Sequence, residues 1–130
     1  MTSGYSGTPL PVKLGIKDRS RVLLDGAPAG FDLDVGDVHR RRTASPYDVG
    51  VLFAPDRARL VKRWPVVHAV MTPAGRLWVA WPKKASGVTT DLDESAVRDH
   101  GLAKGRVDVK ICAIDATWSG LCFVVRVKDR

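Results

Sequence analysis

Short apolar runs, each bounded by turn-forming or charged residues, recur along this chain and predict its buried strands. Three of them are continuous rather than alternating: RVLLD at 21–25, YDVGVLFAP at 47–55 and LWVAWP at 77–82. Continuous runs of this length are typical of strands buried on both faces of a parallel sheet. Within the third run, the two-residue period places Trp78 on one face of the sheet and Trp81 on the other.

Two helical patterns precede or follow these runs. Residues 9–15 predict a short helix with Thr8 as its N-cap and Gly15 at its end. Apolar residues at helical spacing predict a longer helix over 56–71, which Pro65 should kink or split.

The third helix is predicted before residue 101. TPAGR at 72–76 predicts a turn ahead of the third strand, and Asp91-x-x-Glu94 predicts a capping box at the start of the helix. The alternation of strands and helices indicates an α/β fold with right-handed crossovers between parallel strands.

The segment at 38–42 does not fit this alternation. Only four residues separate it from the strand that begins at 47, whereas a parallel crossover requires about a dozen. The segment is therefore either coil or an antiparallel return strand, and we favour the return strand.

The C-terminal part alternates with period two around the loop DATWS. Pairing Ile114 with Gly120 would align the apolar residues on one face, with Asp108 opposite Arg126 on the other. This predicts an antiparallel hairpin, 107–114 with 120–127, joined by a five-residue loop. We therefore expect a three-layer, Rossmann-like α/β domain over 9–130, whose mostly parallel sheet ends in this hairpin, after a flexible arm at 1–8.

Composition narrows the class of protein. The 130 residues contain 21 Lys and Arg against 14 Asp and Glu, a net charge of +7 that would attract phosphates, nucleic acid or acidic partners. No apolar run approaches the roughly 18–20 residues of a membrane span, and the first residues lack the features of a secretory signal. We expect a cytoplasmic protein with no membrane partner.

Two loops of small and basic residues are predicted at one edge of the sheet. The carboxyl ends of parallel strands meet at a common edge, where open α/β sheets bind their ligands. Lysine charge and permissive backbone suit a phosphate or carboxylate there, although a tight turn and an exposed basic loop are the alternatives. The candidate ligand-binding residues are Gly26, Ala27, Gly30, Lys83, Lys84, Ser86 and Gly87.

The order of these segments resembles the class I methyltransferase fold, whose last two strands form such a hairpin. LGIKDRSRVLLDGAPAGF is similar to its first strand and glycine loop, YDVGVLF to its fourth strand and GRLWVAWPK to its fifth. Over nearly its full length, the chain also resembles an actinobacterial family, domain of unknown function 3052. The segments that carry this second resemblance are YSGTPL, KLGIK, LDGAPAGF, YDVGVLF, LWVAWPKKASGV and VDVKICAIDATWSGL. It implies kinship and fold, and no activity.

The methyltransferase resemblance implies S-adenosylmethionine as a possible cofactor, held over the glycine loop and by an acidic residue after the second strand. In this chain Pro28 removes a backbone donor from that loop. The segment that would offer the acid ends in arginines at 40–42. We therefore do not favour this cofactor.

The remaining candidates each have a structural alternative. Asp115 either caps the hairpin loop, which we favour, or serves a site, and Trp118 either folds back over the sheet edge or contacts a ligand. Directly opposed Cys112 and Cys122 would lie within disulfide range, although free thiols are expected in a reducing cytosol. The three histidines have no metal-ligand spacing, which predicts no metal site.

Three hypotheses of function follow. The first is a non-catalytic binding or regulatory module that holds a small anionic ligand or an acidic partner at the sheet edge. The second is an S-adenosylmethionine-dependent methyltransferase with a degenerate cofactor loop. The third is a nucleic-acid-binding protein, for which the candidate residues are Arg40, Arg41, Arg42, Lys62 and Arg63.

Overall fold

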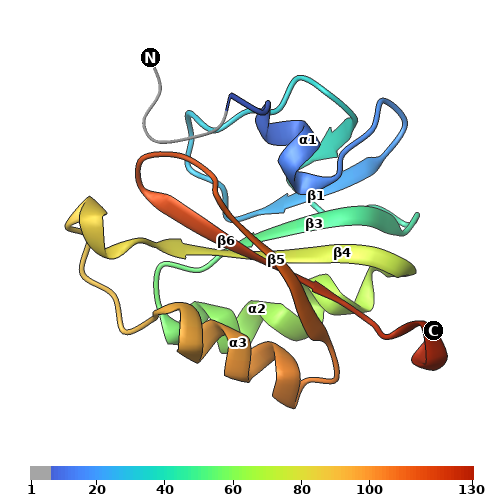
Figure 1. Cartoon of the computed structure of the whole chain (residues 1–130). Helices are drawn as coiled ribbons and strands as arrows, with labels where there is room; N and C mark the ends of the chain where they lie inside the picture. Colours follow the sequence, from blue (N-terminus) through green and yellow to red (C-terminus); the bar gives the residue numbers. More distant parts are fainter. Residues whose placement is uncertain (1–6) are drawn as a thin grey trace.

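A six-stranded mixed sheet forms the centre of the molecule, as a computed structural model that describes residues 7–130 shows (Figure 1). The order of the strands across the sheet is β2-β1-β3-β4-β6-β5. The strands are β1 (Arg21–Asp25), β2 (Asp37–His39), β3 (Tyr47–Phe53), β4 (Met71–Pro82), β5 (Val107–Ala113) and β6 (Trp118–Val124). The helices are α1 (Leu10–Leu14), α2 (Arg57–Ala69) and α3 (Glu94–Ala103), with 3-10 turns at Lys84–Ser86 and Val127–Asp129. Most of the predicted arm at 1–8, residues 1–6, lies outside the described residues.

Strand direction confirms the predicted fold class. Strands β2, β1, β3 and β4 are parallel, whereas β6 runs antiparallel to both β4 and β5. The carboxyl ends of the four parallel strands therefore lie at one edge of the sheet. The predicted mostly parallel, Rossmann-like sheet with a C-terminal antiparallel hairpin is confirmed.

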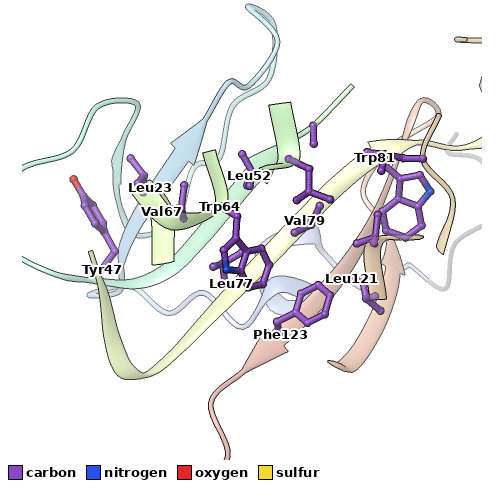
Figure 2. Packing of buried hydrophobic residues seen from close by; sticks show 14 residues of the cluster. Leu23, Tyr47, Leu52, Trp64, Val67, Leu77, Val79, Trp81, Leu121 and Phe123 are labelled. Carbon is purple, nitrogen blue, oxygen red and sulfur yellow. The ribbon is translucent and has the colours of Figure 1, made fainter. Parts of the chain in front are cut away.

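Two apolar layers cover the two faces of the sheet. Helices α2 and α3 cover one face, and α1 covers the other (Figure 1). Trp64 from α2 packs with Leu77, Val79 and Phe123 in the first layer (Figure 2). On the opposite face, Trp78 is fully buried, and its indole Nε1 donates to the carbonyl of Leu14 at 3.1 Å. The predicted alternation along 77–82 is confirmed.

The antiparallel return strand predicted at 38–42 is wrong. The structure has β2 at Asp37–His39, parallel to β1, with Val38 beside Val22. The connection at 40–46 returns only the length of a three-residue strand, about 10 Å at 3.3 Å per residue, so it needs far fewer than a dozen residues. The preceding crossover at 26–36 is an extended coil whose apolar side chains, such as Phe31 and Leu33, join the α1-side core.

Three predicted helix and strand boundaries also change. Residues 72–76 belong to β4 rather than to a turn, and Met71 begins that strand instead of ending α2. Pro65 lies within α2 without splitting it. The N-cap residue of α1 is Pro9 rather than the predicted Thr8.

The predicted capping box of α3 is wrong as well. The N-cap of α3 is Asp93, whose carboxylate accepts from the Ala96 amide at 2.8 Å. Asp91 instead accepts from the Arg57 amide at 2.8 Å and so caps the first turn of α2. A carboxylate at either helix start is stabilising, so the local pattern could not distinguish the two.

The hairpin is confirmed, but its register is shifted. Cys112 lies opposite Gly120 and Lys110 opposite Cys122, and the register shifts again between Asp108 and Lys110. The connection at 114–117 is four residues long, because Asp115 accepts from the Thr117 and Trp118 amides, both at 2.8 Å, and tightens the turn. Asp108 pairs with Arg98 of α3 at 2.9 Å rather than with Arg126.

Candidate functional site

The two candidate loops lie at the same edge of the sheet, separated by β3. Gly26 follows β1 and Lys83 follows β4, and both strands are parallel neighbours of β3. Four surface hollows lie beside β2, beside α1, at the turn after β4 and in the segment that follows this turn, and none of them includes Gly26 or Gly30. The hollow at the turn after β4 has a volume of about 350 Å³ and is lined by Lys83 and Lys84. The shared edge is therefore present, but the two loops form no common hollow there.

The end of β1 carries a buried carboxylate between two arginines. Asp25 is only 6% exposed. Arg59 and Arg63, one helical turn apart on α2, place their Nη2 atoms 2.6 Å from Oδ1 and Oδ2 of Asp25 respectively. The hydrogen bond to Asp25 raises the pKa of Arg63. Two guanidinium groups thus pair with the buried Asp25 carboxylate at the start of the first loop.

Arg59 also packs against Gly26. Its Nε donates to the carbonyl of Phe53 at 2.9 Å, which holds the guanidinium across the loop. A Cβ added to Gly26, whose φ is +74°, would lie 2.4 Å from Nη2 of Arg59. The glycine therefore permits both a left-handed turn and the close approach of the protein's own arginine.

Aromatic side chains fill the α1 side of the same edge. Phe53, the last residue of β3, is fully buried between Phe31 and Trp118, with ring centroids 5.0 and 5.2 Å away. Both contacts are edge-to-face, the geometry that aromatic pairs favour. Of the two alternatives predicted for Trp118, the structure therefore has the one in which the side chain folds back over the sheet edge.

The second loop is a single 3-10 turn after β4. The Ser86 hydroxyl donates to the Lys83 carbonyl at 2.7 Å and accepts from the Val88 amide at 3.2 Å, and Gly87 has a φ of +75°. Among the described residues, the ammonium groups of Lys83 and Lys84 make no ion pair. The adjoining hollow also contains Asp93 and Glu94 at the start of α3.

The five basic residues of the nucleic-acid hypothesis do not gather in one place. Arg63 is held by Asp25, and Lys62 lines none of the four hollows. Arg40, Arg41 and Arg42 line a separate hollow of about 850 Å³ beside β2. The basic residues thus form separate sites rather than one stripe.

The cysteines do not form the opposed pair that the predicted register required. Cys112 and Cys122 lie two positions apart across the hairpin, where Cα atoms are about 7–8 Å apart. Burial raises the pKa of Cys122 to about 12 and also raises the pKa of Cys112. Both thiols are free and protonated at neutral pH.

A buried arginine escaped the sequence analysis. Arg106 is 2% exposed and donates from Nε to His68 Nδ1 at 2.9 Å and from Nη1 to the carbonyls of Gly75 and Phe123. Burial and Arg106 lower the pKa of His68. Arg59 and Arg63 were missed as a pair for Asp25, although their i, i+4 spacing on the helix after a buried strand is visible in the sequence.

Residues 7–130 contain no helix long and apolar enough to cross a membrane. In the same part of the chain, no three His, Cys, Asp or Glu side chains come together in a way that could hold a metal ion.

Solved structures of methyltransferases share this fold. The N-methyltransferase NodS from Bradyrhizobium japonicum WM9 aligns with a TM-score of 0.55 at 14% identity, over 88% of this chain and 90% of that one. A protein from Thermoplasma acidophilum described as a methyltransferase aligns with a TM-score of 0.57 at 11% identity, over 98% of this chain and 77% of that one. No protein-family model and no curated protein sequence matches the chain. The chain therefore has a methyltransferase-like, Rossmann-like fold.

The residues at the end of β1 and β2 do not fit S-adenosylmethionine as the resemblance would require. Arg59 lies where a cofactor would approach the backbone of Gly26. The chain leaves β2 through Arg40, Arg41 and Arg42, so no carboxylate follows that strand to accept from ribose hydroxyls. The direction of β2 was predicted wrongly, but the residues directly after it are arginines whichever way the strand runs.

Proposed function

We propose that this chain is a non-catalytic binding module with a methyltransferase-like fold, which holds a small anionic ligand or an acidic partner at the carboxyl edge of its sheet. The observation that supports a non-catalytic role is the contact of Arg59 with Asp25 and Gly26. Asp25 is buried, Arg59 is partly buried, and the two are joined at 2.6 Å, so displacing Arg59 would remove one of the two cations that pair with this carboxylate. A cofactor at Gly26 would have to displace it.

The anion site of this proposal is the turn at 83–87. Lys83 and Lys84 offer two ammonium groups, and Gly87, with a φ of +75°, permits the left-handed end of the turn that carries them. Asp93 is engaged as the N-cap of α3 and Glu94 pairs with Arg98, so both adjacent carboxylates already have partners. Gly26, Ala27 and Gly30 form the other side of the edge, and we assign them no direct ligand contact.

Methyl transfer is the second candidate, and the comparisons favour it over the binding module, because both solved structures named above are described as methyltransferases. Calorimetric titration with S-adenosylmethionine and S-adenosylhomocysteine separates the two. The binding module predicts no saturable heat with either compound. Saturable binding of either would overturn the non-catalytic proposal and favour the methyltransferase.

The anion site has its own test. Inorganic pyrophosphate should shift the backbone amide resonances of 83–87 saturably, and Lys83→Gln/Lys84→Gln should abolish these shifts. The matched control, Arg126→Gln/Lys128→Gln, removes the same charge from exposed residues elsewhere. Equal loss in both variants, or no shift in the wild type, would contradict the assignment.

A further inference from the structure

A second hollow, separate from the turn at 83–87, lies beside the edge strand β2. Its volume is about 850 Å³, and its lining includes three arginines, Arg40, Arg41 and Arg42, and two carboxylates, Asp32 and Asp34. We propose that this hollow binds a nucleotide whose ribose carries a phosphate group. The proposal goes beyond the anion site above, because it names another place in the fold and another ligand.

The fold itself creates the hollow. The crossover from β1 to β2 is an extended coil at 26–36, so no helix covers the outer side of β2. The coil is held against the core by Leu33 and Val35, which leaves the alternate residues Asp32 and Asp34 exposed. The chain then leaves β2 at its carboxyl end through the three arginines, which line the hollow together with residues of the coil.

Two of the three arginines are available for a ligand. Arg40 is engaged, since its guanidinium donates to the Phe31 carbonyl and lies 3.7 Å from Asp32. Within residues 7–130, the guanidinium groups of Arg41 and Arg42 make no hydrogen bond or ion pair, and both residues are exposed. A guanidinium presents a planar set of donors that matches phosphate oxygens in pairs.

The position of these arginines relative to the sheet suggests which phosphate they would bind. In Rossmann-like sheets, a carboxylate after the second strand accepts from ribose hydroxyls, whereas an arginine there accommodates a phosphate on the ribose. This chain has arginines after its second strand, β2, and β2 is parallel to β1 and adjacent to it. No carboxylate stands directly after β2 in the chain to accept from a free ribose, whereas a ribose phosphate would find two unpaired guanidinium groups there.

The acidic wall is consistent with the same ligand. Asp32 and Asp34 reduce the formal charge of the five lining ionic residues from +3 to +1, so the hollow has only a weak net attraction for a plain anion such as sulfate. A nucleotide also carries hydroxyl and amino donors, which carboxylates accept. The mixed charge of the hollow therefore favours a phosphorylated ligand with donors over a simple anion or a uniform polyanion.

The test compares adenosine 2′,5′-bisphosphate with adenosine by isothermal titration calorimetry on the full chain. We expect saturable binding of the bisphosphate and binding of adenosine that is at least about tenfold weaker, the ratio expected for one charge-assisted contact. Arg41→Gln/Arg42→Gln should lower the affinity for the bisphosphate by roughly tenfold or more. Arg126→Gln/Lys128→Gln, which removes the same charge from exposed positions outside the hollow, should leave its affinity unchanged.

Three results would overturn the proposal: no saturable binding of the bisphosphate, equal affinity for adenosine, or equal weakening by the two double variants. Because all four substituted residues are exposed, far-UV circular dichroism should confirm that each variant folds, and amide shifts in 32–43 locate the ligand independently. These outcomes do not depend on the S-adenosylmethionine titration or on Lys83 and Lys84, so the two proposals can fail separately.

Discussion

Arg59, in the first turn of α2, reaches Asp25 at the carboxyl end of β1, with Nη2 of the arginine 2.6 Å from Oδ1 of the aspartate. The two residues are 34 positions apart in the chain, and their contact places a guanidinium group directly against Gly26. The loop that resembles a cofactor-binding loop is thus occupied by a side chain of the same protein.

Removing Arg59 should destabilise the fold more than removing an equally exposed arginine whose carboxylate partners are not buried. Arg59→Ala leaves the buried Asp25 with Arg63 alone, and we expect a loss of about 2 kcal/mol in the free energy of unfolding. Arg98→Ala is the matched control, because Arg98 likewise has two partners, Glu94 and Asp108, but both carboxylates are more exposed than that of Asp25. Its loss should be clearly smaller. Urea denaturation measures both, and equal losses would contradict the assigned role of Asp25.

Gly101 of α3 lies directly against the Phe123 ring of β6. A Cβ at this position would lie 2.1 Å from Cε1 of the fully buried Phe123. Gly101→Ala should therefore cost about 2 kcal/mol through overpacking, despite the higher helix propensity of alanine. Gly30→Ala is the control, since a Cβ there meets no atom within 4 Å and the backbone is not left-handed. It should change stability by less than about 0.5 kcal/mol in thermal or urea unfolding.

Two histidines should make the protein less stable in mild acid. Burial together with Arg106 lowers the pKa of His68, and burial with Lys104 and Arg57 lowers the pKa of His100. Nε2 of His100 is buried without a hydrogen-bond partner. The unfolded chain therefore binds protons below about pH 6.5 while the folded chain resists them, so stability is complete above that pH and falls as the pH drops below it.

Urea unfolding at a series of pH values between about 8 and 5 measures this dependence. His68→Gln/His100→Gln should flatten the curve, because glutamine does not titrate and its carbonyl can still accept from Arg106. An unchanged slope in the variant would show that other groups cause the loss.

The two cysteines should not form a disulfide within the native hairpin. Cys112 is opposite Gly120, and the thiol pKa of Cys122 is raised to about 12, so little reactive thiolate is present at neutral pH. After mild oxidation of the folded protein, mass spectrometry should find both thiols intact, whereas oxidation in denaturant should join them. A crosslinked Cys112–Cys122 peptide from the native sample would support the predicted register instead of the observed one.

At β2, the sequence analysis predicted the wrong strand direction but correctly identified the arginines that follow the strand. The direction of 37–39 was wrong because a crossover length typical of full strands was applied to a strand of three residues. The arginines after it were nevertheless identified as the replacement for an acid, since that inference required only their order in the chain. The hollow that they share with Asp32 and Asp34 depends on how the coil at 26–36 packs, which no local pattern reports.

Sequence patterns alone located three buried strands, placed Trp78 and Trp81 on opposite faces of the third, and placed a glycine loop and a lysine loop after parallel strands. These properties depend on periodicity and on neighbouring residues, both of which are readable along the chain. The apolar face predicted for 107–113 is not among these successes, because Val109 and Ile111 are 55% and 49% exposed. Only the tertiary structure decided the hairpin register, the helix that Asp91 caps, and the partner of Asp25. Each depends on which of several chemically equivalent partners is brought within about 3 Å by the packing of distant segments, so the residue types alone could not select among them.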